Sequence, residues 1–291
     1  MCDDHTEADN AARRSDLSRR GFAALAGGAA LAACASGQTA DGETLVVSER
    51  DVTITTTDGV CDAHFVHPSR GKHPGVIVWP DIRGLRPAFR QMGKRLAESG
   101  YAVLTVNQFY RNQKAPVVQP GESFSDPAVR ARLMPMAQAL NATTAATDAT
   151  AFVTFLDGQS SVDTGKKIGT TGYCMGGPLV MATAATVPAR IGAGASFHGG
   201  GLATDAPTSP HLRIPQMKAR FLIAVAQNDD ARTPQEKETL RTTFAANGLD
   251  AEIEVYPADH GWCPPDSPVY DEAQAEKAWG RMLVLFGNAL A

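Results

Sequence analysis

The chain carries a potential nucleophile, Cys174, within the stretch Gly172-Tyr173-Cys174-Met175-Gly176-Gly177. Between a strand and a helix, a glycine-x-nucleophile-x-glycine sequence forms a sharp elbow that only small flanking residues allow. The backbone N–H of Met175 then lies at a helix N-terminus, where the helix dipole favours a developing oxyanion. A thiol is already partly ionised near neutral pH and needs less help from a base than a hydroxyl does. The alternative is a glycine-rich turn that contains an inert, buried cysteine.

Two downstream segments supply the partners that such a nucleophile needs. The apolar run Phe221–Ala226 leads into Asp229 and Asp230, and a histidine, His260, lies in the loop before the last predicted helix. Nucleophile, acid and histidine thus follow one another in the order found in α/β-hydrolases. We expect Cys174 to attack, His260 to carry the proton and one aspartate to orient the histidine. Asp229, directly after the strand, is preferred, and Asp230 is the alternative.

Continuous apolar runs, separated by helical patterns, predict the elements that position these residues. Runs without polar alternation are typical of strands buried on both faces, and strand–helix–strand units imply parallel strands with right-handed crossovers. The sequence therefore predicts a single α/β domain, with a mostly parallel central sheet, helices on both faces and an N-terminal antiparallel hairpin. The predicted strands are 74–79, 101–106, 168–171, 194–197 and 221–226, with a hairpin at 52–66 and an edge strand at 251–256. The predicted helices are 87–100, 128–157 (interrupted near Pro135), a helix after the elbow that includes 179–182, 234–246 and 272–290.

A second histidine, His198, also follows a predicted strand. No acid and nucleophile precede it in the required order, so we interpret it as a pocket-lining or structural residue. A lone histidine in a loop is usually just solvated, whereas His260 follows an elbow and an acid in catalytic order.

The composition excludes several classes of protein. Of the 291 residues, 43% are hydrophobic and 20% are charged, which is an ordinary balance for a globular domain. The net charge of −4 shows no basic excess, so we expect no nucleic acid partner. No run approaches the ~20 apolar residues of a membrane span. The five cysteines have the spacing of neither a disulfide framework nor a zinc site, and we expect no bound metal.

The first residues have the pattern of an export signal. Ser18-Arg19-Arg20-Gly21-Phe22 precedes a short apolar segment, Ala23–Ala33, as in twin-arginine signals. Leu31-Ala32-Ala33-Cys34 resembles a bacterial lipobox, in which the cysteine is lipidated and becomes the mature N-terminus. The alternative is a plain signal peptide in which Cys34 is incidental. We expect an export signal over 1–33, a tether over 34–47 and an exported domain over 48–291. This domain would be periplasmic or in the cell envelope, held to the membrane only through a lipid on Cys34.

From about residue 48 onward, the chain resembles the dienelactone hydrolase family, which are α/β-hydrolases with a Cys-His-Asp triad. The resemblance implies that Cys174 attacks the carbonyl of a small ester or lactone, while the N–H groups of Ile82 and Met175 form the oxyanion hole. It implies no metal or organic cofactor, and we expect a monomer. The alternatives are a thioesterase or acyl transferase with the same triad, or a non-catalytic binding lipoprotein. The matching motifs are Trp79-Pro80-Asp81-Ile82-Arg83-Gly84-Leu85, Tyr101-Ala102-Val103-Leu104, the elbow hexapeptide and His260-Gly261-Trp262.

The chain departs from the family pattern around the substrate. Family members that act on enol-lactones have a glutamate where Asp81 stands, and it helps to govern the protonation of the nucleophile. We expect Asp81 to face Cys174 and to raise the pKa of the thiol; the alternative is that Asp81 caps the loop backbone. The same members hold a substrate carboxylate with two arginines, of which Arg111 could stand for the first, while none follows His260 here. We expect Arg111 and Trp262 to contact the substrate; the alternative for Arg111 is a surface arginine on a loop.

Overall fold

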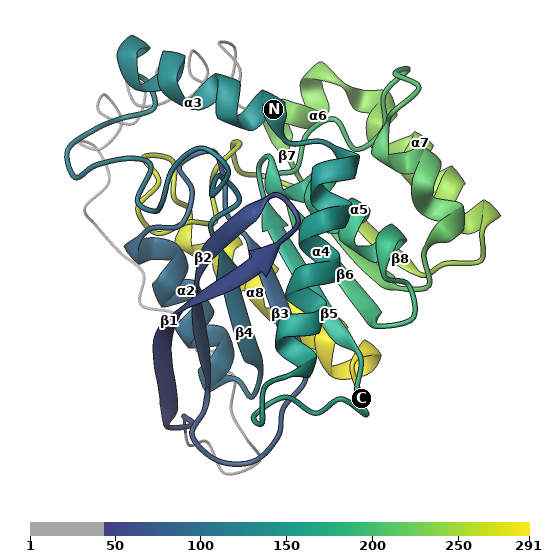
Figure 1. Ribbon diagram of the computed structural model, residues 1–291. Coiled ribbons are helices and arrows are strands. Elements are labelled where there is room, and N and C mark those ends of the chain that lie inside the picture. Colours follow the sequence, from purple (N-terminus) through teal and green to yellow (C-terminus); the bar gives the residue numbers. More distant parts are fainter. Residues whose placement is uncertain (1–43) are drawn as a thin grey trace, which may run out of the picture.

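The computed structural model describes residues 44–291, which form an eight-stranded sheet in the order β1-β2-β4-β3-β5-β6-β7-β8 (Figure 1). β1 pairs antiparallel with β2, and β2 with β4, whereas the other neighbours are parallel. The predicted hairpin and the mostly parallel sheet are therefore confirmed. The strands are β1 (Val47–Thr56), β2 (Gly59–Pro68), β3 (Gly75–Trp79), β4 (Ala102–Val106), β5 (Ile168–Tyr173), β6 (Ile191–Phe197), β7 (Arg220–Ala226) and β8 (Ala251–Tyr256).

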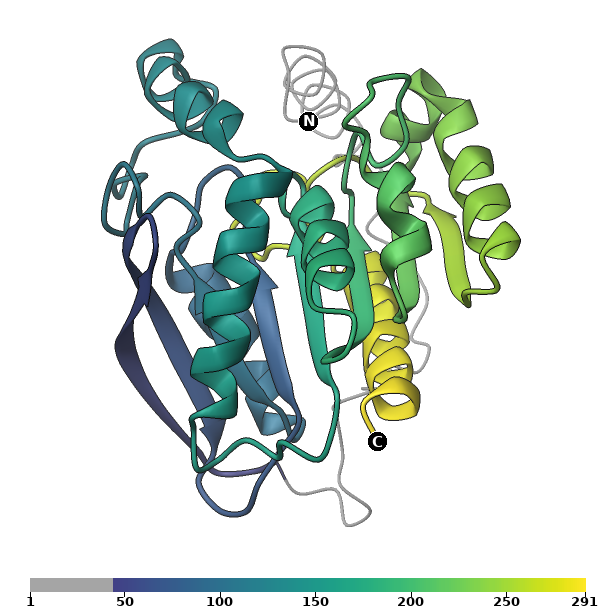
Figure 2. The same cartoon turned by 45° about the vertical axis from the view of Figure 1, so that its right-hand side comes forward.

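Helices cover both faces of the sheet, as expected. Side chains of α2 and α8 pack with the sheet in one core cluster, and those of α4, α5 and α7 in another. In Figure 2 the yellow α8 and the teal α4 accordingly lie on opposite sides of the strands. The helices are α2 (Pro87–Glu98), α3 (Pro127–Ala139), α4 (Ala142–Asp157), α5 (Gly176–Thr186), α6 (Gln227–Arg232), α7 (Pro234–Ala246) and α8 (Glu272–Ala289), with a 3₁₀ helix, η1, at Pro210–Gln216.

The central strands are buried on both faces because their sequences are almost wholly apolar. Every residue of β3 and β4 is buried, as their continuous apolar runs predict. β8 forms one end of the sheet, and most of its residues are half-buried. Because β3, β5, β6, β7 and β8 run parallel, their C-terminal ends lie along one edge of the sheet, which we call the carboxyl edge. The residues expected to be catalytic follow three of these strands.

One helical region differs from expectation. α3 runs through Pro135, and the break comes later, at Asn141. The Asn141 side chain accepts hydrogen bonds from the backbone N–H groups of Thr143 and Thr144, and the Thr144 hydroxyl accepts one from the Asn141 N–H. This reciprocal cap starts α4 and sets the boundary between α3 and α4. Pro135 does not end α3.

The predicted export signal, Cys34 and most of the predicted tether lie outside the described residues. β1, the first element of the domain, begins at Val47, next to the boundary expected at residue 48. Within residues 44–291, no helix has both the length and the apolar character needed to cross a bilayer.

Candidate active site

The elbow after β5 holds Cys174 in a strained conformation. Its φ of 55° lies in the left-handed region, which residues other than glycine rarely adopt. Two glycines allow the turn. A Cβ on Gly172 would lie 2.3 Å from the carbonyl oxygen of Gly176, and one on Gly176 would lie 2.5 Å from that of Trp79. These glycines let β5, α5 and the end of β3 meet around the cysteine.

Two backbone N–H groups at the elbow, those of Ile82 and Met175, have no hydrogen-bond acceptor within residues 44–291. The loops that carry them are neighbours, because β3 pairs with β5 and Gly176 touches the end of β3. The side chains of Ile82 and Met175 pack in the same apolar cluster. Unpaired N–H groups beside a helix N-terminus are suited to hold an oxyanion. The structure thus leaves the two N–H groups expected from the sequence unpaired, on neighbouring loops.

His260 is oriented by an aspartate at the end of β7. Its Nδ1 lies 2.7 Å from Asp229 Oδ2, and its backbone N–H donates to Asn228 Oδ1 at 2.9 Å. Both acceptors belong to α6, a short helix that begins directly after β7 and that the sequence analysis did not predict. Asp230, one position further round this helix, pairs with Lys237 instead. The geometry therefore favours Asp229 over Asp230 as the partner of His260.

The electrostatics of the site place a proton on His260. Burial disfavours its charged form, but the charges of Cys174 and Asp229 and their hydrogen bonds outweigh this and raise the pKa of His260 to about 9. Burial also acts against the Asp229 carboxylate, yet the hydrogen bond from His260 holds the pKa of Asp229 below its usual range. A pKa of about 9 keeps His260 mainly protonated at neutral pH, beside Cys174.

His198 supports this pair, a role more specific than the pocket-lining or structural one expected. It follows β6, the neighbour of β5, with a φ of 41°, and its Nδ1 accepts the backbone N–H of Cys174 at 3.1 Å. The His198 ring centroid lies 4.9 Å from that of His260 and 5.1 Å from that of Trp262. Burial, and then the charge of His260, lower the pKa of His198, so the ring stays neutral and can accept a hydrogen bond. The signal in the sequence was a histidine at the end of the strand after the elbow.

The structure corrects the expectation for Asp81. Its Oδ1 lies 2.7 Å from Arg86 Nη1, and its Oδ2 lies 2.9 Å from Arg86 Nη2. Asp81 Oδ1 also accepts the backbone N–H of Arg83 at 2.9 Å. The carboxylate is thus neutralised by an arginine and caps its own loop.

The structure also corrects the role expected of Arg111. Its Nη2 and Nη1 lie 2.7 and 2.9 Å from the two carboxylate oxygens of Asp148, and its Nη2 lies 2.6 Å from Asp58 Oδ2. Asp148 is a buried residue of α4, and Asp58 lies in the turn between β1 and β2. Arg111 therefore ties the hairpin to α4. Its guanidinium is already paired with two carboxylates.

Trp262 is the third correction. Its side chain is fully buried, stacks on Tyr256 and meets the edge of His198. Such a residue offers no surface to a substrate. It packs the loop that carries His260 against the sheet.

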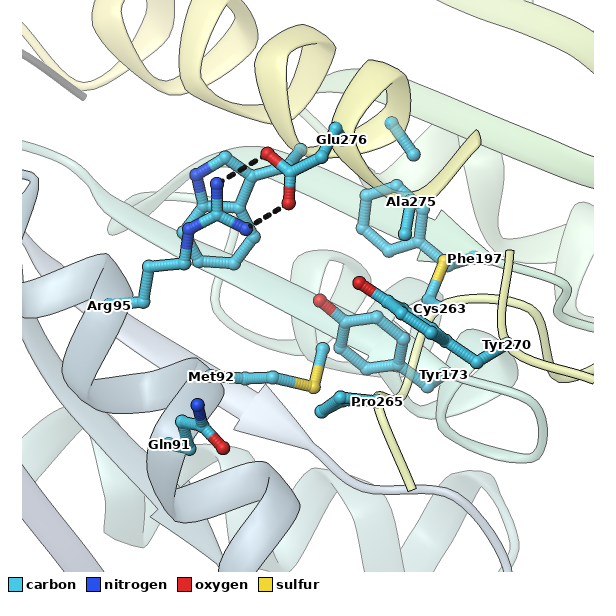
Figure 3. A pocket seen from close by; sticks show the side chains of 12 residues that line it. Gln91, Met92, Arg95, Tyr173, Phe197, Cys263, Pro265, Tyr270, Ala275 and Glu276 are labelled. Carbon is cyan, nitrogen blue, oxygen red and sulfur yellow. Dashed lines mark hydrogen bonds and ion pairs between the residues drawn. The ribbon is translucent and has the colours of Figure 1, made fainter. Parts of the chain in front are cut away.

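A cavity of about 130 Å³ lies beside the elbow on the face covered by α2 and α8 (Figure 3). Tyr173 and Phe197, the last residues of β5 and β6, form part of its wall. Cys263 also lines it, and burial raises the pKa of this thiol well above the usual value. A thiol that stays protonated is a poor nucleophile, so Cys263 is not a substitute for Cys174.

Comparison with known proteins identifies relatives of this chain. The model of the dienelactone hydrolase family matches residues 61–290. A carboxymethylenebutenolidase from Pseudomonas sp. (strain P51) is 26% identical over 223 residues, which cover 76% of this chain and 87% of the relative. Among solved structures, a dienelactone hydrolase from Anabaena variabilis superposes with a TM-score of 0.60 at 16% identity, covering 84% of this chain and 99% of its own. A dienelactone hydrolase-like promiscuous phosphotriesterase, P91, from metagenomic libraries superposes with a TM-score of 0.68 at 22% identity, covering 84% and 99%. At these identities the two structures establish the α/β-hydrolase fold, and the family model establishes that the chain belongs to the dienelactone hydrolase family.

Proposed function

We propose that the protein hydrolyses ester or lactone bonds of small molecules, with Cys174, His260 and Asp229 as a catalytic triad. The observation that carries the proposal is the relay from Asp229 to His260 to Cys174 beside the unpaired N–H groups of Ile82 and Met175. A nucleophile, an oriented proton donor and an oxyanion site are the parts that acyl transfer requires.

The reaction would proceed in two steps. The Cys174 thiolate attacks the substrate carbonyl, and the resulting oxyanion accepts hydrogen bonds from Ile82 and Met175. Each such donor is worth roughly 10²–10³ in kcat. His260 gives its proton to the leaving alkoxide as the C–O bond breaks, which leaves a thioester on Cys174. Water then attacks the thioester with His260 as the base, and the acid departs as the thiolate is restored.

The proposal makes no use of a carboxylate anchor. Arg111, the residue expected to hold a substrate carboxylate, already binds Asp148 and Asp58. We therefore propose that this chain shares the carbonyl chemistry of its family but does not use Arg111 to bind a substrate carboxylate.

Release of p-nitrophenol from p-nitrophenyl acetate tests the proposal. Cys174→Ala should lower kcat by about 10³-fold or more, because the covalent route is lost. Cys263→Ala is the matched control and should retain activity within about twofold, because its buried thiol stays protonated. Hydrolysis at the wild-type rate by Cys174→Ala would contradict the proposal.

The N-terminal motifs support a separate proposal about location, that the protein is exported and anchored by a lipid on Cys34. A Cys34→Ala variant expressed in a bacterial host should move from the membrane fraction to the soluble fraction. Unchanged membrane association would remove the anchor.

A further inference from the structure

The proposed chemistry depends on two loops that follow non-adjacent strands of the sheet. The loop after β3 carries the Ile82 N–H, and the loop after β8 carries His260. In the sheet, β3 and β8 are separated by β5, β6 and β7 (Figure 1). The two strands do not pair directly, so side chains that bridge the two loops can fix their spacing more closely than the sheet alone.

Arg86 joins the two loops. It binds Asp81 in the first loop at 2.7 and 2.9 Å, and Asp266 in the second through Nε at 2.7 Å and Nη2 at 2.9 Å. Its Nη1 also donates to the carbonyl oxygen of Gly84 at 3.2 Å. The Arg86 side chain is only 5% exposed, and Arg83 adds a contact to Asp266 at 3.2 Å. A planar guanidinium that meets two carboxylates in pairs fixes their relative geometry, which a flexible ammonium would not.

The same loop fixes the direction of the Ile82 N–H. The carbonyl oxygen of Asp81 accepts from Gln108 Nε2 at 2.8 Å and from the backbone N–H of Gly84 at 2.9 Å. This carbonyl belongs to the same peptide unit as the N–H of Ile82. In a trans peptide the two groups point in opposite directions, so holding the carbonyl turns the N–H away from Gln108. Arg86 holds the other side of the loop through the Asp81 carboxylate.

We propose that Arg86 is a positioning residue that keeps the oxyanion donor Ile82 and the proton donor His260 at a fixed spacing, with Asp266 as the far end of the clamp. The proposal rests on the proposed function, because it assigns Arg86 a part in that reaction. The clamp consists of Asp81, Arg86 and Asp266. Arg86 acts through these carboxylates and not on the reacting atoms, so it is a positioning residue and not a catalytic one.

The chain contains a matched control for the clamp. Arg95 in α2 forms two hydrogen bonds of 2.6 Å with Glu276 in α8, at the rim of the cavity (Figure 3). This pair also joins the segment after β3 to the segment after β8. It belongs to the helices and not to the loops, so its loss should affect stability without moving Ile82.

The test separates the oxyanion donor from the nucleophile. Hydrolysis of p-nitrophenyl acetate uses both, whereas alkylation of Cys174 by iodoacetamide needs only the thiolate. Asp266→Ala should lower kcat about tenfold with KM within about threefold, because a displaced oxyanion donor loses part of its 10²–10³ effect. Its alkylation rate should stay within about twofold of wild type. Two milder variants should each lose less kcat than Asp266→Ala. These are Asp266→Asn, which keeps one acceptor, and Arg86→Lys, which keeps the charge but not the fork. Glu276→Ala should retain wild-type kcat.

Three results would overturn the clamp. These are an unchanged kcat in Asp266→Ala, an alkylation rate that falls in parallel with kcat, and an equal loss of kcat in Glu276→Ala. The proposed function fails differently, through wild-type hydrolysis by Cys174→Ala. Circular dichroism and thermal melting of each variant ensure that only folded proteins are compared.

Discussion

Polar groups at the ends of β5 and β6 differ in their hydrogen bonding from those in the flanking loops. At the strand ends, Cys174 and His198 have positive φ values, and the Met175 N–H has no acceptor among the described residues. On the flanks, Arg86 and Arg111 each bind two carboxylates. Strain and unmet hydrogen bonds therefore gather at the groups proposed to react, while the arginines of the flanking loops are held in ion pairs.

The largest test of this contrast compares two adjacent aspartates. Asp229→Asn should lower kcat about 10³-fold, because the amide cannot orient and stabilise a protonated His260. Asp230→Asn should change kcat less than about threefold, because it removes only a partly exposed pair with Lys237. Both rates are measured with p-nitrophenyl acetate. The assignment of the acid fails if the two losses are reversed or equal.

A second test uses the described cysteines as reporters. Burial, and then the charge of Asp148, raise the pKa of Cys61, and burial raises the pKa of Cys263. Cys174 should therefore react with iodoacetamide about 10²-fold faster than either at pH 7, since only a thiolate reacts. Mass mapping after short exposure gives the order of modification. Earlier labelling of Cys263 would mean that the reactive thiol has been misassigned.

A third test addresses the flank. Arg111→Ala should lower the free energy of unfolding by about 2–4 kcal/mol, because it leaves Asp148 buried without its counter-charge. Arg132→Ala, which removes a surface pair with Glu122, should have a much smaller effect, because solvent screens such pairs. Urea unfolding measures both.

The pH dependence of the Arg111→Ala variant gives a further check. Burial raises the pKa of Asp148, so its folded form binds a proton more readily than the unfolded chain does. Stability linked to this group is therefore lost as pH rises through the raised pKa and recovered as pH falls. Part of the deficit of Arg111→Ala should disappear on acidification. A selective rise in KM for a carboxylated ester, with unchanged stability, would restore the substrate role instead.

The smallest expected effect is on the titration of His260. Nitrogen-detected NMR should find its pKa at about 9 in the wild type, with the imidazolium present below that pH. In Cys174→Ala the value should fall by about one unit or more toward the ordinary 6.5, because the nearby thiolate is gone. The sign follows from linkage: the stability contributed by charged His260 is complete below about 6.5 and is lost as pH rises through about 9. An unchanged pKa in Cys174→Ala would mean that the two side chains are not coupled.

The sequence predicted the sheet and the placement of the candidate residues well, because both depend on local patterns. Apolar runs locate β3 and β4, and the order of Cys174 and His260 at strand ends follows from the chain itself. The choice between Asp229 and Asp230 depends on α6, and no sequence motif predicts that this helix starts directly after β7. The short helix decides which carboxylate turns toward His260.

Contacts between charged residues that lie far apart along the chain were not predicted. Arg111 meets Asp148, 37 residues away, and Asp266 meets Arg86 across 180 residues. A pattern of neighbours in sequence carries no information about such pairs. Trp262 stands two residues after His260, which made it look like part of the site, but its side chain packs into the sheet.

Two glycines, Gly172 and Gly176, limit which substitutions the elbow can accept. At Gly172 and Gly176 any side chain would collide with backbone atoms, which cannot move aside as a side chain does. Cys174 itself is different, because serine is slightly smaller and would fit the same strained turn. One substitution is thus enough to change the nucleophile, whereas Gly172 and Gly176 accept no other residue. A relative that keeps both glycines can therefore change its nucleophile without changing the backbone of its active site.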